Sequence, residues 1–235
     1  MKKKSALFLI VVGLFGLQAL GFAEGAALSG KVNFEGVPPE PKPINFGAEK
    51  QCAMMHGDKM PVDESIVING NKTVKWALVY VKDAKGEFKA PETAVEMDQN
   101  GCVFSPHAIA VIAGQKITFK NGDPVLHNVR TNSKVNKAFN IAQPIQGMKT
   151  SKSFAQEEIG IQIRCDVHFW MAAYVHVLSH PYFAVTGDDG SFTIKDLPAG
   201  TYTVEVWHEK LGTQTAQVTV EDGEAKITDF TLKLA

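Results

Sequence analysis

Short runs in which apolar and polar residues alternate, or in which β-branched residues cluster, recur along the chain and predict β-strands. The predicted strands cover residues 30–34, 65–68, 74–81, 108–112, 115–120, 159–164, 173–177, 191–194, 201–208, 213–220 and 227–232. Turn-forming sequences such as Asn69-Gly70-Asn71 and Asp188-Asp189-Gly190 separate them. No long amphipathic helical period stands out. Short strands at this spacing predict an all-β chain that folds as β-sandwiches or Greek-key barrels.

The first residues of the chain have the pattern of a secretion signal. Three lysines at positions 2–4 precede an apolar run over residues 6–20, and Gly21-Phe22-Ala23 then offers small residues for cleavage. We predict a signal peptide over residues 1–23 and a periplasmic or secreted mature chain. An uncleaved membrane anchor is the alternative, although the run is short for a helix that spans a bilayer.

Length, charge and the absence of two known motifs limit the number of domains and the classes of function. The 235 residues suffice for one large or two small domains. The formal net charge of −1 gives no sign of a nucleic-acid-binding surface. The chain contains neither a zinc-binding His-x-x-Glu pattern nor a Cys-x-x-Cys-His haem attachment sequence. We predict no catalytic residues and expect that the protein is not an enzyme.

Three cysteines in an exported chain suggest one disulfide bond and one thiol that is kept for chemistry. Cys165 lies within a ligand-like motif, so Cys52 and Cys102 are the expected disulfide pair. Their distant sequence positions neither support nor exclude this pairing.

The C-terminal stretch resembles a known β-sandwich family. An Asp-Gly turn is followed by a phenylalanine and then by a Pro-x-Gly-x-Tyr corner, at Asp189-Gly190, Phe192 and Pro198-Ala-Gly200-Thr-Tyr202. This pattern resembles the carboxypeptidase regulatory-like (transthyretin-like) domain. The resemblance implies a sandwich in which the phenylalanine enters the core.

The stretch that resembles this family is too short for a complete sandwich. Residues 28–36 and 76–82 are candidates for the missing strands. We therefore predict a discontinuous outer domain over residues 27–98 and 180–235, with a second domain inserted at residues 99–179. Two sequential domains are the alternative.

A cluster of potential metal ligands follows the predicted strand at residues 159–164. Cys165, His168 and Met171 bring a thiolate, an imidazole and a thioether together in one short loop. Type 1 copper is bound by two imidazoles and one thiolate, with a weak axial thioether. A second imidazole is available from His127, which follows the predicted strand at residues 115–120.

The short Cys-x-x-His-x-x-Met loop with an upstream His-Asn pair resembles the cupredoxins, and the amicyanin type in particular. The resemblance implies a Greek-key sandwich with one type 1 copper ion, held in plane by His127, Cys165 and His168, with Met171 as the axial ligand. It also implies that Asn128 connects the two ligand loops by hydrogen bonds. Without copper, the cysteine and methionine would be ordinary packing residues.

The chain departs from the family pattern at Leu126, before the upstream histidine, and at Phe169-Trp170, where the family has a proline and an aromatic residue. Neither change removes a ligand. The resemblance implies an exposed His168, and we expect Trp170 beside it to affect partner docking.

Other residues with metal-binding chemistry have simpler interpretations. The segment from Cys52 to Met60 carries soft donors that suit Cu(I), but a disulfide at Cys52 and methionines on apolar surface would explain it equally. We interpret Asp188 and Asp189 as turn residues rather than calcium ligands. Four further histidines are interpreted as structural, with His208 at a strand edge or an exposed tip: His107, His176, His180 and His208.

We interpret the chain as a periplasmic blue copper protein that carries single electrons between other periplasmic redox proteins. We expect these electrons to pass through His168 and the apolar residues around it. A copper-trafficking protein that handles Cu(I) through the Cys52–Met60 segment is the alternative. A copper enzyme would need additional copper ions and His-x-His pairs, and the chain has no His-x-His pair.

Overall fold

The computed structural model describes residues 24–234, in which the regular elements are β-strands apart from one short helix. The prediction of an all-β chain is confirmed. The predicted signal peptide lies outside the described residues. Within residues 24–234, no helix has the length and apolar character needed to cross a membrane.

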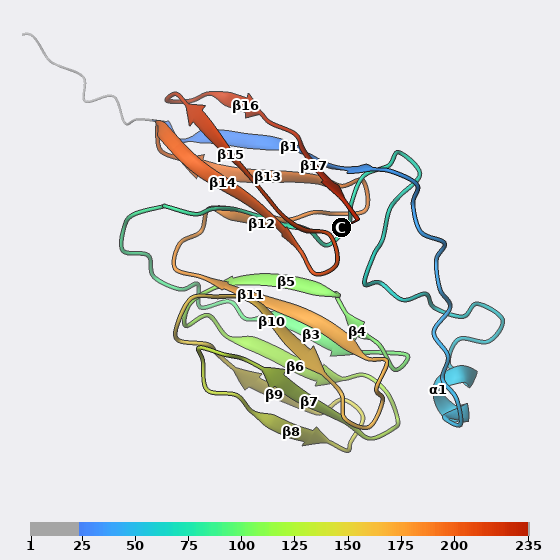
Figure 1. The fold of residues 1–235 in the computed structure, drawn as a ribbon. Coiled ribbons are helices and arrows are strands. Elements are labelled where there is room, and N and C mark those ends of the chain that lie inside the picture. Colours follow the sequence, from blue (N-terminus) through green and yellow to red (C-terminus); the bar gives the residue numbers. More distant parts are fainter. Residues whose placement is uncertain (1–23, 235) are drawn as a thin grey trace, which may run out of the picture.

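The first sandwich joins the beginning and the end of the described chain (Figure 1). One of its sheets contains β1 (Ala26–Glu35), β13 (Ser191–Leu197), β16 (Ala225–Ile227) and β17 (Phe230–Lys233). The other has the order β12 (Phe183–Val185), β2 (Leu78–Val81), β14 (Gly200–His208) and β15 (Gly212–Val220). β1 pairs antiparallel with β13 and parallel with β16 and β17. A single apolar cluster fills the space between the sheets.

The second sandwich is built from the middle of the chain. Its larger sheet has the order β5 (Ala108–Ile112), β11 (Ala172–Leu178), β10 (Glu158–Arg164), β7 (His127–Asn132) and β8 (Asn140–Gln143). Its smaller sheet has the order β4 (Phe104–Ser105), β3 (Val95–Gln99), β6 (Ile117–Asn121) and β9 (Lys149–Lys152). The core between them is centred on Phe119, Phe154, Ile161 and Ile163.

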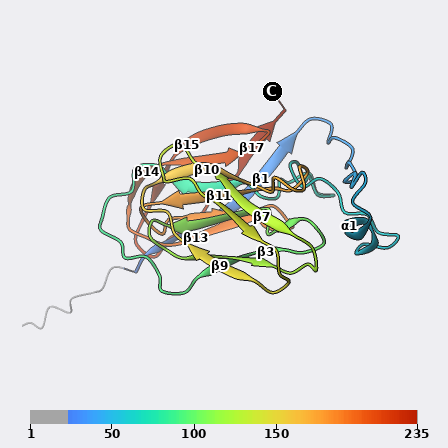
Figure 2. The same ribbon diagram turned by 90° about the horizontal axis from the view of Figure 1, so that it is seen from below.

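The two sandwiches pack against each other through one sheet of each. In β2, Val79 and Val81 point into the first core, whereas Leu78 and Tyr80 join a third apolar cluster with Leu178 of β11. All four residues of β2 are therefore buried, because the strand has a hydrophobic neighbour on each face. Figure 1 shows the resulting stack of sheets, and Figure 2 shows the same stack from below.

Trp207 of β14 is the largest side chain at this contact. Its ring lies against His176 of β11 with 4.9 Å between ring centroids, and close to Gly160 of β10. Gly160 has φ +77°, a left-handed conformation that favours glycine, and an added Cβ would lie 2.9 Å from the Trp207 ring. The glycine thus both permits the local irregularity in β10 and leaves room for the indole.

Residues 36–72 form a largely irregular segment, here called the arm, that leaves the first sandwich after β1 and returns to it before β2. The arm contains α1 (Lys50–Met54), whose one buried residue is Cys52. Cys52 forms a disulfide bond with Cys102, as expected, and Phe46 packs into the core of the second sandwich. Figures 1 and 2 show α1 at the side of the molecule.

The strand predictions differ from the structure in specific places. The strand at residues 108–112 is confirmed in full, whereas residues 65–68 form only an isolated bridge between Ile68 and Val74. β7 was not predicted, because its polar sequence lacks an apolar alternation. The predicted division into domains stays a prediction, but the contacts place Phe46 and Met97, which belong to the predicted outer domain, in the core of the second sandwich.

Two buried histidines at the contact between the sandwiches make the fold sensitive to acid. Burial and the nearby His208 lower the pKa of His176 to about 3, and burial with the charges of His107 and Lys210 lowers the pKa of His208 to about 4. In the unfolded chain both histidines have a pKa near 6.5. The unfolded state therefore binds more protons below pH 6.5, and folding stability is lost as the pH falls from there toward the folded-state values.

We expect each of these histidines to lower the free energy of unfolding by about 2 kcal/mol between pH 7 and pH 5. Denaturant titrations at a series of pH values would measure this slope. The His176→Gln variant should show a shallower dependence on pH in the same range. Equal slopes for the variant and the parent chain would contradict the assignment to His176.

Candidate metal centre

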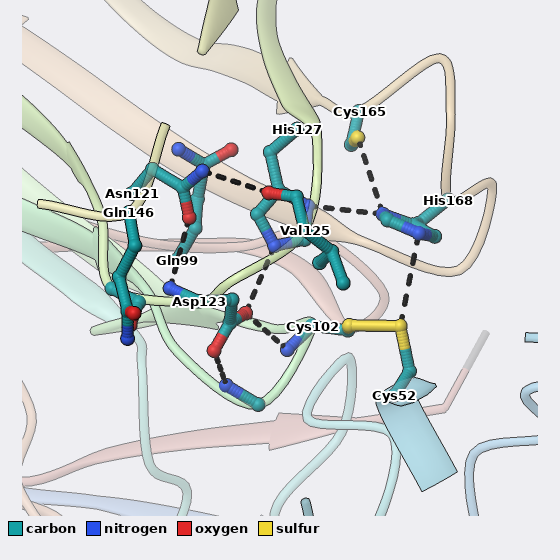
Figure 3. A network of polar contacts seen from close by, with 12 residues as sticks. Cys52, Gln99, Cys102, Asn121, Asp123, Val125, His127, Gln146, Cys165 and His168 are labelled. Atoms are coloured by element: carbon teal, nitrogen blue, oxygen red, sulfur yellow. Dashed lines mark hydrogen bonds and ion pairs between the residues drawn. A yellow bond between two sulfur atoms is a disulfide. The ribbon is translucent and has the colours of Figure 1, made fainter. Parts of the chain in front are cut away.

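Three buried side chains with metal-binding chemistry meet at one end of the second sandwich. A ring nitrogen of His127, the Sγ of Cys165 and a ring nitrogen of His168 all lie within 4.8 Å of one another. The three residues are between 0% and 2% exposed. Figure 3 shows them converging from two different segments of the chain.

Strand pairing explains why these distant residues meet. β7 and β10 are antiparallel neighbours, with Arg130 opposite Arg164. His127 at the start of β7 and Cys165 just after β10 are therefore at the same end of the sheet. The loop after β10 then folds back on itself, because the Met171 N–H donates to the His168 carbonyl oxygen at 2.9 Å. This turn places His168 beside Cys165.

Asn128 connects the segments that carry His127 and Cys165, as the family resemblance implies. Its Oδ1 accepts a hydrogen bond from the Asp166 N–H at 2.6 Å and lies 3.4 Å from the Sγ of Cys165. Its side-chain amide donates to Asn140 of β8 at 2.6 Å. The loop that carries Cys165 is thus anchored to β7 by a side chain rather than by strand pairing alone.

The carboxylate of Asp123 fixes the orientation of His127. One oxygen lies 2.9 Å from the Nε2 of His127, and the carboxylate also accepts the backbone N–H groups of Gly101 and Cys102 at 2.7 and 2.8 Å. Burial would raise the pKa of this carboxyl, but the hydrogen bonds with His127 and the two amides hold it below its usual value. Asp123 is therefore an ionised carboxylate in a buried position.

Sequence reasoning did not identify Asp123. Asp123 lies four residues before a predicted ligand, in the sequence Asn121-Gly122-Asp123-Pro124. An aspartate is common in such a turn and needs no further explanation there. A histidine ligand needs an acceptor for its second ring nitrogen, and that requirement is the signal that could have pointed to this residue.

These contacts constrain the proton positions on the two histidines. Because Asp123 is an acceptor, the Nε2 of His127 carries a hydrogen. The Nδ1 atoms of His127 and His168 are 2.9 Å apart, so one of them carries the hydrogen that the two atoms share. A metal ion that binds both Nδ1 atoms would replace this shared proton.

Hydrogen bonds around Cys165 favour its thiolate form. Burial would raise the pKa of the Cys165 thiol, but its hydrogen bonds with His127 and His168, supported by the Asn128 and His168 backbones, lower the pKa to about 6. Burial would lower the pKa of His127, but Asp123 and Cys165 raise it above its usual value. Two imidazole nitrogens and a thiolate form the donor set of type 1 copper, so the residues present fit that ion.

Met171 is buried in the same core cluster as Cys165. Both backbone groups of Met171 form hydrogen bonds within the loop, since its carbonyl oxygen also accepts the Cys165 N–H at 3.4 Å. The structure thus places Met171 at the end of the loop that carries Cys165 and His168, hydrogen-bonded to both. Its role as an axial ligand stays a prediction.

A disulfide bond covers the outer edge of His168. The Sγ of Cys52 lies 3.7 Å from the Nε2 of His168, and Figure 3 shows the Cys52–Cys102 bond next to the ring. Trp170 lies against the same ring with 5.1 Å between centroids and donates its indole N–H to the Cys102 carbonyl oxygen. The expectation of an exposed His168 is therefore wrong, because the arm and the disulfide exclude solvent from it.

The remaining candidates lie away from this cluster. Asp188 and Asp189 form a turn, as predicted, and Asp189 caps it by accepting from Ser191. His107 contacts the Glu209 carboxylate at 2.5 Å. His208 is the last residue of β14, but it is buried and its Nδ1 accepts backbone N–H groups, so the expectation of an exposed tip is wrong.

Comparisons with known proteins agree with the C-terminal resemblance. Residues 172–233 match the carboxypeptidase regulatory-like domain family. The match begins within β11, before the boundary that the sequence suggested. No curated protein sequence matches the chain.

Several solved structures are similar to part of the chain. A novel purple cupredoxin from Nitrosopumilus maritimus is 21% identical, with 36% of this chain and 99% of that chain covered and a TM-score of 0.32. Amicyanin from Paracoccus versutus is 19% identical, with 43% and 97% covered and a TM-score of 0.33. A Cu-containing nitrite reductase from Thermus scotoductus is 17% identical, with 51% and 27% covered and a TM-score of 0.35. The case for a metal centre therefore rests on its own geometry.

The hydrogen bonds around Cys165 give a direct prediction. In the metal-free protein we expect the thiol to ionise with a pKa of about 6, well below its usual value of 9.0. The ultraviolet absorbance of the thiolate, followed against pH, would measure it. In the His127→Ala variant the pKa should rise, because a hydrogen bond to the thiolate is lost. A pKa that is the same with and without His127 would contradict this explanation.

Proposed function

We propose that the protein is a type 1 copper protein that carries single electrons between redox partners in the periplasm or outside the cell. The observation that carries the proposal is the buried convergence of His127, Cys165 and His168 within 4.8 Å. The predicted signal peptide and the Cys52–Cys102 disulfide support an exported chain. We propose a carrier rather than an enzyme.

In this proposal the protein contributes a rigid and dry ligand set. Copper would supply a one-electron change of oxidation state. His127 is held by Asp123 and Cys165 by Asn128, so the ligands keep their positions independently of the metal. Cys165 offers a thiolate near neutral pH, and Met171 would complete the ligand set. A site that does not rearrange has a small barrier to electron exchange.

The burial of His168 changes the proposed route for electrons. The cysteine side of the centre borders a surface cleft of about 400 Å³, whose lining includes Cys165, Arg130, Arg164 and Phe169. Phe169 is 72% exposed and offers an apolar contact at the cleft. We therefore place the docking surface for redox partners here. A small, transient interface would suit such exchange.

The visible absorption spectrum of the copper-loaded, oxidised protein tests the proposed function. We expect an intense thiolate-to-copper band at about 600 nm. The Cys165→Ser variant should lose this band, whereas the His180→Gln variant, changed at a buried histidine away from the centre, should keep it. A copper-loaded parent chain without the band, with Cys165 reduced, would overturn the proposal.

The Asp123 carboxylate gives a second expectation. The Asp123→Asn variant keeps the shape of the side chain but removes its charge, so His127 loses a charged acceptor. We expect its Cu(II) affinity to fall by roughly 10- to 100-fold. Competition with a chelator of known affinity would measure it, with Asp188→Asn, a change in an exposed turn, as the control. Equal affinities for the two variants would rule out this role for Asp123.

A further inference from the structure

The ring of His168 faces sulfur on both of its edges. Its Nδ1 points toward His127 and lies 3.8 Å from the Sγ of Cys165, whereas its Nε2 lies 3.7 Å from the Sγ of Cys52. Metal-ligand atoms of Cys52, Cys102 and His168 all lie within 4.8 Å of one another in a buried position. The proposed electron-transfer site uses only one of these two edges.

We propose that Cys52 and Cys102, when their disulfide is reduced, form with the Nε2 of His168 a second site, which binds Cu(I). Two thiolates and one imidazole are soft donors of the kind that select Cu(I). While the sulfurs are bonded to each other they have no thiolate to offer. The oxidation state of the pair therefore decides whether the site exists. This inference does not depend on copper at Cys165.

The chemistry needs a thiol reductant, such as a dithiol protein of the same compartment. The reductant gives two electrons and two protons to the disulfide, the bond between the Cys52 and Cys102 sulfurs breaks, and the reductant becomes a disulfide itself. Both thiols then lose their protons when they bind Cu(I), because the thiolate is the ligand.

Contacts other than the disulfide hold two of the three proposed ligands. The Cys102 N–H is held by the Asp123 carboxylate, and the Cys102 carbonyl oxygen by the Trp170 indole. Cys102 also has φ +56°, a left-handed conformation that is costly for a residue with a side chain and persists only when the surroundings hold it. His168 is held by the loop that it shares with Cys165.

The third proposed ligand lies on the arm, of which few buried side chains enter the second sandwich. Cys52 is the one buried residue of the five-residue helix α1, so the disulfide is the main attachment of that helix. Phe46 against Trp170 and the contact of His56 with the Gly101 carbonyl oxygen are its neighbouring attachments. Reduction would let α1 lift and admit an ion. Three exposed thioethers on the arm provide soft contacts for its arrival, at Met54, Met55 and Met60.

The test is a Cu(I) titration of the intact chain carrying Cys165→Ser, which removes the first site. The chain is measured with its disulfide intact, and again after reduction by a dithiol that is then removed without air. A chromophoric Cu(I) chelator serves as the competitor. We expect one tightly bound Cu(I) per chain after reduction only, and X-ray absorption should show two sulfur ligands and one nitrogen ligand.

Further variants assign the ligands. Adding Cys52→Ser, Cys102→Ser or His168→Ala to this chain should each weaken binding at least tenfold, whereas Met54→Leu should leave it unchanged. Equal binding by the oxidised and reduced chains would overturn the proposal, because the exposed methionines would then account for it. Circular dichroism checks that the reduced chain stays folded, and a chain that unfolds on reduction would also overturn it. The visible spectrum of the parent chain separately tests the proposed function.

Discussion

The buried carboxylate of Asp123 is the interaction on which the organisation of the metal centre depends. An isolated charge in this position would cost several kcal/mol, so it persists only because it accepts hydrogen bonds from His127, Gly101 and Cys102. One group thereby fixes a ligand on β7 and the loop that carries the disulfide. The same carboxylate consequently holds both the candidate ligand His127 and the disulfide that shields His168 from solvent.

The disulfide next to His168 distinguishes this candidate centre from one in which a histidine ligand is exposed to solvent. The arm reaches from the first sandwich to the second, and its disulfide encloses His168 together with Trp170, against which Phe46 of the arm packs. The two edges of the His168 ring therefore have different surroundings. One edge is directed into the core of the second sandwich, and the other is directed toward a segment held by very few buried side chains.

Much of this organisation could be predicted from the sequence, because the relevant signals are local. The spacing of Cys165, His168 and Met171 is contained in seven consecutive residues, and the turn at Asp189 is determined by its neighbours in the sequence. The burial of His168 could not be predicted in this way, because it depends on the arm, more than a hundred residues earlier in the chain. Asp123 was missed for a related reason, since the local sequence around an exposed turn aspartate is the same as that around a buried, ionised one.

The pairing of β1 with β17 has a consequence for how the chain folds. Lys31 and its partner Asp229 are 198 residues apart, so β1 is made first among the described strands but completes its sheet only when β17 has emerged. Contacts at such separations form slowly, because the entropy of closing the long loop comes before any gain from pairing. The second sandwich, from β3 to β11, contains its own strand partners and can assemble earlier. While the chain folds, the side of β1 that pairs with β16 and β17 would therefore remain an unpaired edge until these last strands have formed, and such an edge is prone to aggregation.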